Sequence, residues 1–146
     1  MNPASVAERV AINIPAELGR LAAVRAFVRD RLGAIGIERE PVGDLVQAVD
    51  ECVTNVIVHG YDGRAGEVEV ELEAAPQSVV VRVRDSADPF DPTGVPPPDP
   101  DRPLEERLHG GMGISLMRAA VDELHHRLLP DGRNELTMIK RIEPAE

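Results

Sequence analysis

The sequence predicts an α+β fold, formed by one domain of 146 residues. Three segments carry apolar residues at helical spacing, at about residues 16–35, 41–60 and 114–124. Short stretches rich in β-branched residues lie between and around them, separated by turn residues as in strands and hairpins. A chain of this length buries roughly two thirds of the surface of its unfolded state, so we expect a single hydrophobic core.

The first two predicted elements are a strand and a packing helix. Residues 9–15 show the short alternation and the β-branched side chains of a strand, which ends at Pro15. Apolar residues then recur at helical spacing over residues 16–35, with charged residues on the opposite side. Gly33 and Gly36 are expected to close this helix.

The second predicted helix opens at Pro41, whose missing N–H costs nothing in a first turn, and it has two different flanks. One flank is an apolar stripe formed by Leu45, Val49, Cys52, Val53 and Val56. Glu51 and Asn55 lie one turn apart on another flank, where a carboxylate and an amide oxygen suit a general base and a magnesium ligand. The alternative is a pair of solvated surface residues. We expect Gly60 to end this helix in the left-handed conformation.

A predicted hairpin follows and ends in an aspartate. Residues 66–74 alternate three apolar residues with four glutamates, which predicts one packed face and one solvated face that carries the glutamates. Residues 79–84 form the second strand after a turn at 76–78. This strand delivers Asp85 at its end, a place where functional side chains often emerge.

A proline-rich segment separates the hairpin from a glycine-rich helix start. Residues 86–109 hold seven of the 13 prolines, and we expect a lid inserted into a single domain over residues 1–146 rather than a linker. Gly110, Gly111 and Gly113 then precede a helix, so their backbone N–H groups can approach a phosphate closely. The alternative is a flexible loop with a helix cap.

The end of the chain is predicted to form a last hairpin, over residues 127–142. His125 and His126 fall at the end of the helix over 114–124. Because adjacent residues do not share a helix face, we do not expect these two histidines to bind a metal together.

Composition and charge exclude several classes of function. The formal net charge is −10 and basic residues form no cluster, which argues against direct binding to nucleic acid or to an anionic membrane. The single cysteine, Cys52, lies on the apolar stripe and is expected to be a buried free thiol, as in a reducing compartment. No apolar run approaches ~20 residues and the first residues do not resemble a signal peptide, so we expect a cytoplasmic protein.

Three motifs in order resemble those of one protein family. The first is Glu51-x3-Asn55-x3-His59-Gly-Tyr, which is similar to the N box of the GHKL superfamily. The second is Asp85-Ser-Ala87-Asp-Pro-Phe90-Asp-Pro, which is similar to the first glycine box, and the third is Gly110-Gly111-Met112-Gly113-Ile, which is similar to the second glycine box. Together they resemble the bacterial anti-sigma factor serine/threonine kinases. The resemblance implies the Bergerat fold, a two-layer α/β sandwich with helices on one face of a mixed, mostly antiparallel sheet.

The resemblance also implies a role for individual residues in binding ATP and Mg²⁺. Asn55 would coordinate Mg²⁺, and Glu51 would be the general base that accepts the proton of a substrate hydroxyl. Asp85 would accept a hydrogen bond from the adenine amino group. The remaining nucleotide-binding residues implied by the motifs are His59, Ala87, Phe90, Arg107, Gly110, Gly111, Met112 and Gly113.

Two residues depart from the family pattern. Ala87 stands where the first glycine box usually has glycine, so its Cβ is expected to crowd the adenine or to lower the affinity. Arg107 is separated from Gly110 by two residues, whereas the family's phosphate-contacting arginine directly precedes its box.

The function implied by the resemblance is partner switching. Such a kinase would be a homodimer that phosphorylates a serine or threonine on a STAS-domain anti-anti-sigma factor and sequesters a sigma factor. Two alternatives stay open on the sequence. One is a non-catalytic partner-binding module that retains the fold, with ATP as a structural ligand or with none. The other is a magnesium ATPase without a protein acceptor.

Overall fold

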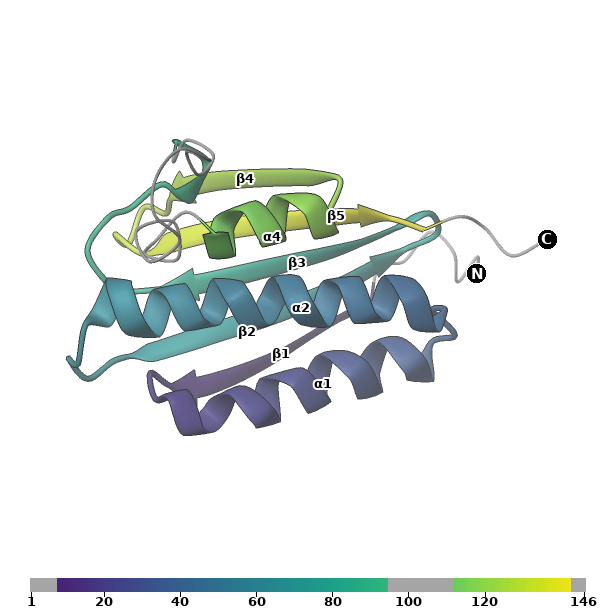
Figure 1. Cartoon of the computed structure of the whole chain (residues 1–146), viewed down its shortest axis with the longest axis horizontal. Coiled ribbons are helices and arrows are strands. Elements are labelled where there is room, and N and C mark those ends of the chain that lie inside the picture. The colour runs from purple at the N-terminus through teal and green to yellow at the C-terminus, as the bar shows by residue number, and fades with distance from the viewer. Residues whose placement is uncertain (1–7, 95–111, 143–146) are drawn as a thin grey trace.

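A computed structural model of the protein describes residues 8–94 and 112–142. Five strands form one sheet in the order β1-β2-β3-β5-β4, and the four described strand pairings are all antiparallel. Helices α1, α2 and α4 lie side by side over one face of this sheet (Figure 1). The predicted α+β fold, with two layers, is therefore confirmed. No helix in the described ranges is long and apolar enough to cross a membrane.

The elements follow the chain with three short helices between them. The strands are β1 (Glu8–Pro15), β2 (Glu67–Ala75), β3 (Ser78–Asp85), β4 (Glu123–Leu128) and β5 (Asn134–Arg141). The helices are α1 (Leu21–Ala34), α2 (Arg39–Asn55) and α4 (Met112–Ala120), and the short helices are η2 (Leu18–Arg20), η3 (Val56–Tyr61) and η4 (Pro92–Gly94). Only the first part of the predicted lid at 86–109 lies within the described residues.

The core lies between the sheet and α2, the central helix of the helical layer (Figure 1). Leu45, Val49, Cys52 and Val53 of α2 are almost completely buried, as the apolar stripe predicts. They belong to one cluster with the inward-facing valines of β2 and β3. Each side chain of this size stabilises the fold by about 1.5–3 kcal/mol when it is fully buried. The free thiol of Cys52 is part of this core.

The end of α2 differs from the prediction. The chain continues from α2 into the π-helical turn η3, and the left-handed residues are Asp62 (φ 49°) and Gly63 (φ 84°) rather than Gly60. The prediction that Gly60 ends the helix in the left-handed conformation is therefore wrong. Asp62 takes that conformation because its short polar side chain tolerates it better than most. The extra turn brings the hydroxyl of Tyr61 to the start of β2 and the end of β3.

The boundary between α4 and β4 also differs from the prediction. The helix ends at Ala120, not at Leu124, and Leu124 belongs to β4. The backbone N–H of Asp122 donates to Ile139 O (2.8 Å), and its carboxylate accepts the N–H of Arg141 (2.6 Å). These bonds dock the chain onto β5, and strand pairing then satisfies the backbone better than a further helical turn. His125 and His126 consequently lie in a strand, where they point to opposite sides.

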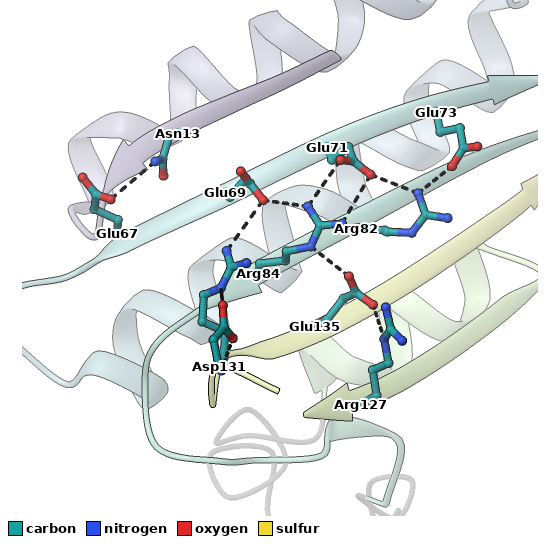
Figure 2. A network of polar contacts seen from close by, with 11 residues as sticks. Asn13, Glu67, Glu69, Glu71, Glu73, Arg82, Arg84, Arg127, Asp131 and Glu135 are labelled. Atoms are coloured by element: carbon teal, nitrogen blue, oxygen red, sulfur yellow. Dashed lines mark hydrogen bonds and ion pairs between the residues drawn. The ribbon is translucent and has the colours of Figure 1, made fainter. Parts of the chain in front are cut away.

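The open face of the sheet is more ordered than a solvated row of glutamates. Figure 2 shows the glutamates of β2 beside Arg82 and Arg84 of β3, and Glu135 of β5 between Arg84 and Arg127. Arg82 binds Glu71 (3.0 Å) and Glu73 (2.6 Å), and Arg84 binds Glu69 (2.6 Å). The hairpin register places Glu69 opposite Arg84 and Glu71 opposite Arg82, and Glu73 reaches Arg82 diagonally. The sequence alternation predicted which face the glutamates occupy, but not that ion pairs partly bury them.

Glu135 of β5 is the most buried acid on this face, with 3% of its surface exposed. It accepts hydrogen bonds from Arg127 (2.6 Å) and Arg84 (2.8 Å). Burial raises the pKa of this carboxyl, but the two arginines outweigh burial and hold the pKa below its usual value. A carboxyl with a depressed pKa stabilises the fold above its ordinary pKa, and this contribution is lost as the pH falls through the folded-state value.

We expect Glu135→Gln to lower the free energy of unfolding by about 1–3 kcal/mol at neutral pH, because a buried hydrogen-bonded charge is lost. The difference from the unsubstituted protein should shrink as the pH falls below the ordinary glutamate pKa of 4.5. Urea denaturation from neutral to acidic pH measures both effects. Glu17→Gln, which removes an exposed pair with Arg20, is the control and should change stability by less than ~1 kcal/mol. An equal loss in both variants would contradict the assigned role of Glu135.

Candidate functional site

A cavity of about 700 Å³ lies between the end of α2, the loop that follows β3 and the helix α4. Five of the sequence-predicted site residues line it, namely Asn55, His59, Asp85, Ala87 and Phe90. Glu51 is half-buried on α2, one turn before Asn55, and is not among the lining residues. The structure thus gathers residues from three separate stretches of the chain around one space.

The second glycine box is described only in part. Met112 and Gly113 form the first residues of α4, so the helix begins within this motif. Arg107, Gly110 and Gly111 lie outside the described residues. Further along α4, Ile114 and Met117 line the cavity and are buried, which places the start of this helix beside the site.

Asp85 ends β3 and is a buried acid at the cavity wall, with 6% of its surface exposed. Its Oδ1 accepts hydrogen bonds from the N–H of Ala87 (2.9 Å) and from Nδ2 of Asn134 (3.1 Å). Burial raises the pKa of the carboxyl, although these bonds and the nearby His126 lower it in part. Oδ2 accepts no hydrogen bond from any described residue, so this oxygen is free to accept one from a ligand.

Asn134 holds the loop after β3 in place, and the sequence did not reveal it. Its Nδ2 donates to Asp85 and to the carbonyl oxygens of Ala87 (3.1 Å) and Asp88 (3.3 Å). Its Oδ1 accepts the N–H of Phe90 (3.3 Å). Asn134 lies directly opposite Asp85 in the pairing of β3 with β5. A polar residue at the start of the last strand was the available signal, but it becomes meaningful only once the strand partner is known.

His126 of β4 is a second site residue that the sequence placed wrongly. Its side chain lines the cavity, and Nε2 lies 3.1 Å from Oδ1 of Asn134. Its Nδ1 lies 3.8 Å from a carboxylate oxygen of Asp91. His125, its neighbour, is exposed and contacts Glu123 instead (3.1 Å). Both histidines were predicted at the end of a helix, where nothing in the sequence indicates that His126 lies in a strand and reaches the loop after β3.

Tyr61 fixes the end of η3 to the sheet beneath the cavity. Its hydroxyl donates to the carbonyl oxygen of Glu67 (2.7 Å) and accepts the N–H of Ser86 (2.8 Å). The ring lies over Gly66, where a Cβ would come within 2.2 Å of the ring. Glycine is required at this position because of the close approach. Tyr61 therefore ties the helix that carries Asn55 to the strand end that carries Asp85.

Arg64 closes the same end of the cavity. Its guanidinium donates to the carbonyl oxygens of Tyr61 (2.9 Å) and Gly60 (2.8 Å), and it lies 3.4 Å from the carboxylate of Asp88. Carbonyl groups at a helix end have no partner within the helix, and a basic side chain satisfies them. Arg64 thus connects the end of η3 to the loop after β3.

Ala87 packs against Gly60, across the cavity wall. A Cβ added to Gly60 would lie 3.1 Å from the Cβ of Ala87, closer than ordinary van der Waals contact. Ala87 is itself buried, with 7% of its surface exposed. The two positions therefore share the space of one methyl group, and the glycine at position 60 makes room for the alanine at position 87.

We expect Gly60→Ala to destabilise the protein by about 1 kcal/mol, because overpacking outweighs the better helix propensity of alanine. The double variant Gly60→Ala/Ala87→Gly should regain the stability of the original protein, since it moves the methyl group to the other side. Thermal unfolding of the single and double variants measures this coupling. Additive effects of the two substitutions would contradict the shared space.

The side chains around the cavity indicate which metal ion it could bind. Within residues 8–94 and 112–142, no group of three or more His, Cys, Asp or Glu side chains is arranged to hold a metal. Mg²⁺ fits such a site, since it takes oxygen ligands and is commonly bound by one or two protein groups together with phosphates and water. Asn55 lines the cavity and carries an amide oxygen, a donor of the type that Mg²⁺ accepts.

Comparison with known proteins gives a match over most of the chain. Residues 14–140 match the family described as histidine kinase-like ATPase domain. The serine-protein kinase RsbW of Oceanobacillus iheyensis is 26% identical over 122 residues, which cover 79% of this chain and 76% of that protein. The serine-protein kinase RsbW of Bacillus licheniformis is 27% identical over 125 residues, which cover 82% of this chain and 78% of that protein.

Solved structures share the fold. The structure of the RsbU and RsbW domains of Rv1364c from Mycobacterium tuberculosis matches 95% of this chain with a TM-score of 0.63 and 24% identity. This chain spans 34% of that longer protein. A structure of the SiaB-SiaC complex from Pseudomonas aeruginosa matches 91% of this chain and 89% of the solved chain, with a TM-score of 0.54 and 16% identity.

Proposed function

The chain belongs to the histidine kinase-like ATPase domain family, and from this we propose that it is an ATP-dependent serine/threonine protein kinase. The observation that carries the proposal is the cavity, which is lined by a buried acceptor, Asp85, and by Asn55, whose amide oxygen would bind magnesium. A cavity of about 700 Å³ has the size of a site for a small organic ligand. The relatives named serine-protein kinase support transfer to a protein hydroxyl.

In the proposed complex, Oδ2 of Asp85 accepts a hydrogen bond from the amino group of adenine. Guanine carries a carbonyl oxygen at that position, which a carboxylate repels, so this contact would select ATP over GTP. Asn134 and the N–H of Ala87 hold Oδ1 and leave Oδ2 available. The base would lie against Ala87 and the apolar side chains of α4 that line the cavity.

The phosphates would lie toward Asn55 and the start of α4. Mg²⁺, held by Asn55, would neutralise charge on the phosphates during transfer. The backbone N–H groups at the beginning of α4, near Gly113, would donate to phosphate oxygens. Glu51 would take the proton of the attacking hydroxyl. Because Glu51 does not line the described cavity, the substrate protein would have to approach along the flank of α2 that carries Glu51.

The proposed acceptor is a serine or threonine on a STAS-domain anti-anti-sigma factor. The proposed second partner is a sigma factor, which this protein sequesters. The protein itself is proposed to be a homodimer. The support is the similarity to RsbW proteins and to one member of the SiaB-SiaC complex. Phosphorylation of the antagonist would leave the sigma factor bound, so the balance of ATP and antagonist would set the free sigma concentration.

Incubation with γ-labelled ATP, Mg²⁺ and a candidate STAS-domain antagonist tests the kinase. We expect label on a serine or threonine of the antagonist, and none when that residue is replaced by alanine. Release of labelled phosphate without a labelled protein would instead identify a magnesium ATPase.

One observation favours a second candidate, a non-catalytic partner-binding module. Glu51, the proposed base, does not line the described cavity. Such a module would bind its partner without transferring phosphate, with ATP as a structural ligand or with none. Partner binding measured together with the labelling experiment separates the two, because the module binds the antagonist or sigma factor yet leaves both unlabelled.

A further inference from the structure

His126 contacts two parts of the proposed adenine site, namely Asn134 on β5 and the loop after β3. Nε2 of the imidazole lies 3.1 Å from Oδ1 of Asn134, the residue that holds Asp85. Nδ1 lies 3.8 Å from Oδ1 of Asp91. Asp91 belongs to the loop after β3, where its carboxylate also accepts the N–H of Thr93 (2.9 Å). One ring therefore contacts both the base-recognition residues and the start of η4.

The hydrogen bonds of Asn134 determine which nitrogen of His126 carries a proton. Three acceptors surround Nδ2 of Asn134, and the N–H of Phe90 donates to its Oδ1, so the orientation of the amide is fixed. His126 must then donate from Nε2 to that oxygen. In the neutral ring with its proton on Nε2, Nδ1 carries a lone pair 3.8 Å from the carboxylate of Asp91, and the two repel. In the protonated ring, Nδ1–H can donate to this carboxylate once the loop moves closer.

We propose that His126 is a positioning residue of the nucleotide site, whose imidazolium form bridges Asn134 and Asp91 and draws the loop after β3 against the bound base. The inference rests on the proposed nucleotide-binding function. Protonation would add a charged hydrogen bond to Asp91 and a positive charge near Asp85, which favours the ionised carboxylate that accepts from the base.

Charged groups face the ring from several elements. Among the described residues, Asp91 faces it from the loop and Asp85 from β3. Arg118 of α4 contributes to the lowered pKa of Asp91, and its guanidinium donates to the carbonyl oxygens of Pro92 and Thr93, so it holds the loop. Arg127 and Glu135, the next residues on β4 and β5, are paired with each other on the opposite face of the sheet.

The test is the pH dependence of ADP affinity, measured by calorimetry with Mg²⁺ between about pH 6 and about pH 8, where histidines change charge. Relative to His126→Gln, the unsubstituted protein should lose about two- to fivefold in affinity as the pH rises, the range expected for a partly exposed ion pair. Glutamine still donates to Asn134 but does not titrate. The ionisation of ADP is common to both proteins, so the ratio of the two affinities reports on position 126.

Two further variants sharpen the result. His125→Gln removes the exposed histidine next in the chain and should keep the pH dependence. Asp91→Asn leaves the imidazole in place but removes its charged partner, and it should flatten the dependence even if His126→Gln does not fold.

Several outcomes would overturn the inference. An unchanged pH dependence in His126→Gln or in Asp91→Asn would show that the bridge does not act, while ADP binding itself would leave the proposed function intact. A flat profile in the unsubstituted protein would have the same meaning. No ADP binding at any pH would refute the nucleotide site and this role of His126 together.

Discussion

Glu51→Gln is expected to bind ATP as the original protein does but to lose about 10²–10⁴-fold in the rate of phosphoryl transfer, the usual contribution of a general base. Glutamine preserves the size of the side chain and the helix α2, and it cannot accept the proton. Glu51 is half-buried and does not line the cavity, so the substitution should leave the proposed adenine and phosphate contacts unchanged. Single-turnover transfer from labelled ATP to the antagonist measures the rate, and calorimetry measures ATP binding.

Asn55→Ala is the matched comparison, one helical turn away on the same helix. It removes an oxygen from the cavity wall and is expected to weaken binding of Mg-ATP while affecting ATP without metal much less. The two variants should therefore separate binding from transfer. Normal transfer by Glu51→Gln would exclude this residue as the base and would favour a proton acceptor elsewhere, for example on the substrate itself.

The parts of the fold that follow from local patterns were predicted correctly. The apolar stripe of α2 is buried as expected, and the hairpin of β2 and β3 pairs antiparallel through a turn at 76 and 77. Both signals depend on residues close in sequence, where helical spacing and alternation reflect burial directly. The family resemblance, drawn from three motifs, is confirmed by the match over residues 14–140.

The two wrong predictions concern the ends of α4 and α2, where the local sequence is compatible with more than one structure. The apolar spacing after Ile114 continues past Ala120, so it predicts a longer helix, yet pairing with β5 takes over at Glu123. The end of α2 was misplaced for a related reason. A glycine near a helix end predicts a left-handed cap, whereas Gly60 is needed for the close approach of Ala87. Tertiary contacts decided both cases, and no local pattern contains them.

The candidate site shows the same division. Asp85, Asn55 and Ala87 could be singled out because they belong to motifs, but their roles remain proposals. Asn134 and His126 belong to no motif and come to the site through the pairing of β5 with β3 and β4. A sequence lists such residues without their partners, so the residues that hold a site are harder to predict than those that contact a ligand.

Asp85→Asn is expected to lower the affinity for ATP by about 100-fold, because a bond to a charged acceptor is lost and a donor then faces the amino group of adenine. The amide oxygen of the new side chain still accepts from Ala87 and Asn134, so the loop keeps its structure. Burial raises the pKa of Asp85, which means that ionisation of this carboxyl costs stability in the folded state. The variant should therefore be as stable as the original protein at neutral pH, or more stable.

Asn134→Ala should behave differently, although it alters the same site. It leaves Asp85 and the carbonyl oxygens of Ala87 and Asp88 without their shared donor, so we expect a loss of about 1–3 kcal/mol in stability together with weaker binding. Base selectivity distinguishes the two roles. In Asp85→Asn, the amide N–H₂ can donate to the carbonyl oxygen of guanine, so the preference for ADP over GDP should fall, whereas Asn134→Ala should weaken ADP and keep that preference. If Asp85→Asn retained both affinity and selectivity, adenine would not be recognised through Asp85, and the base would have to lie elsewhere in the cavity.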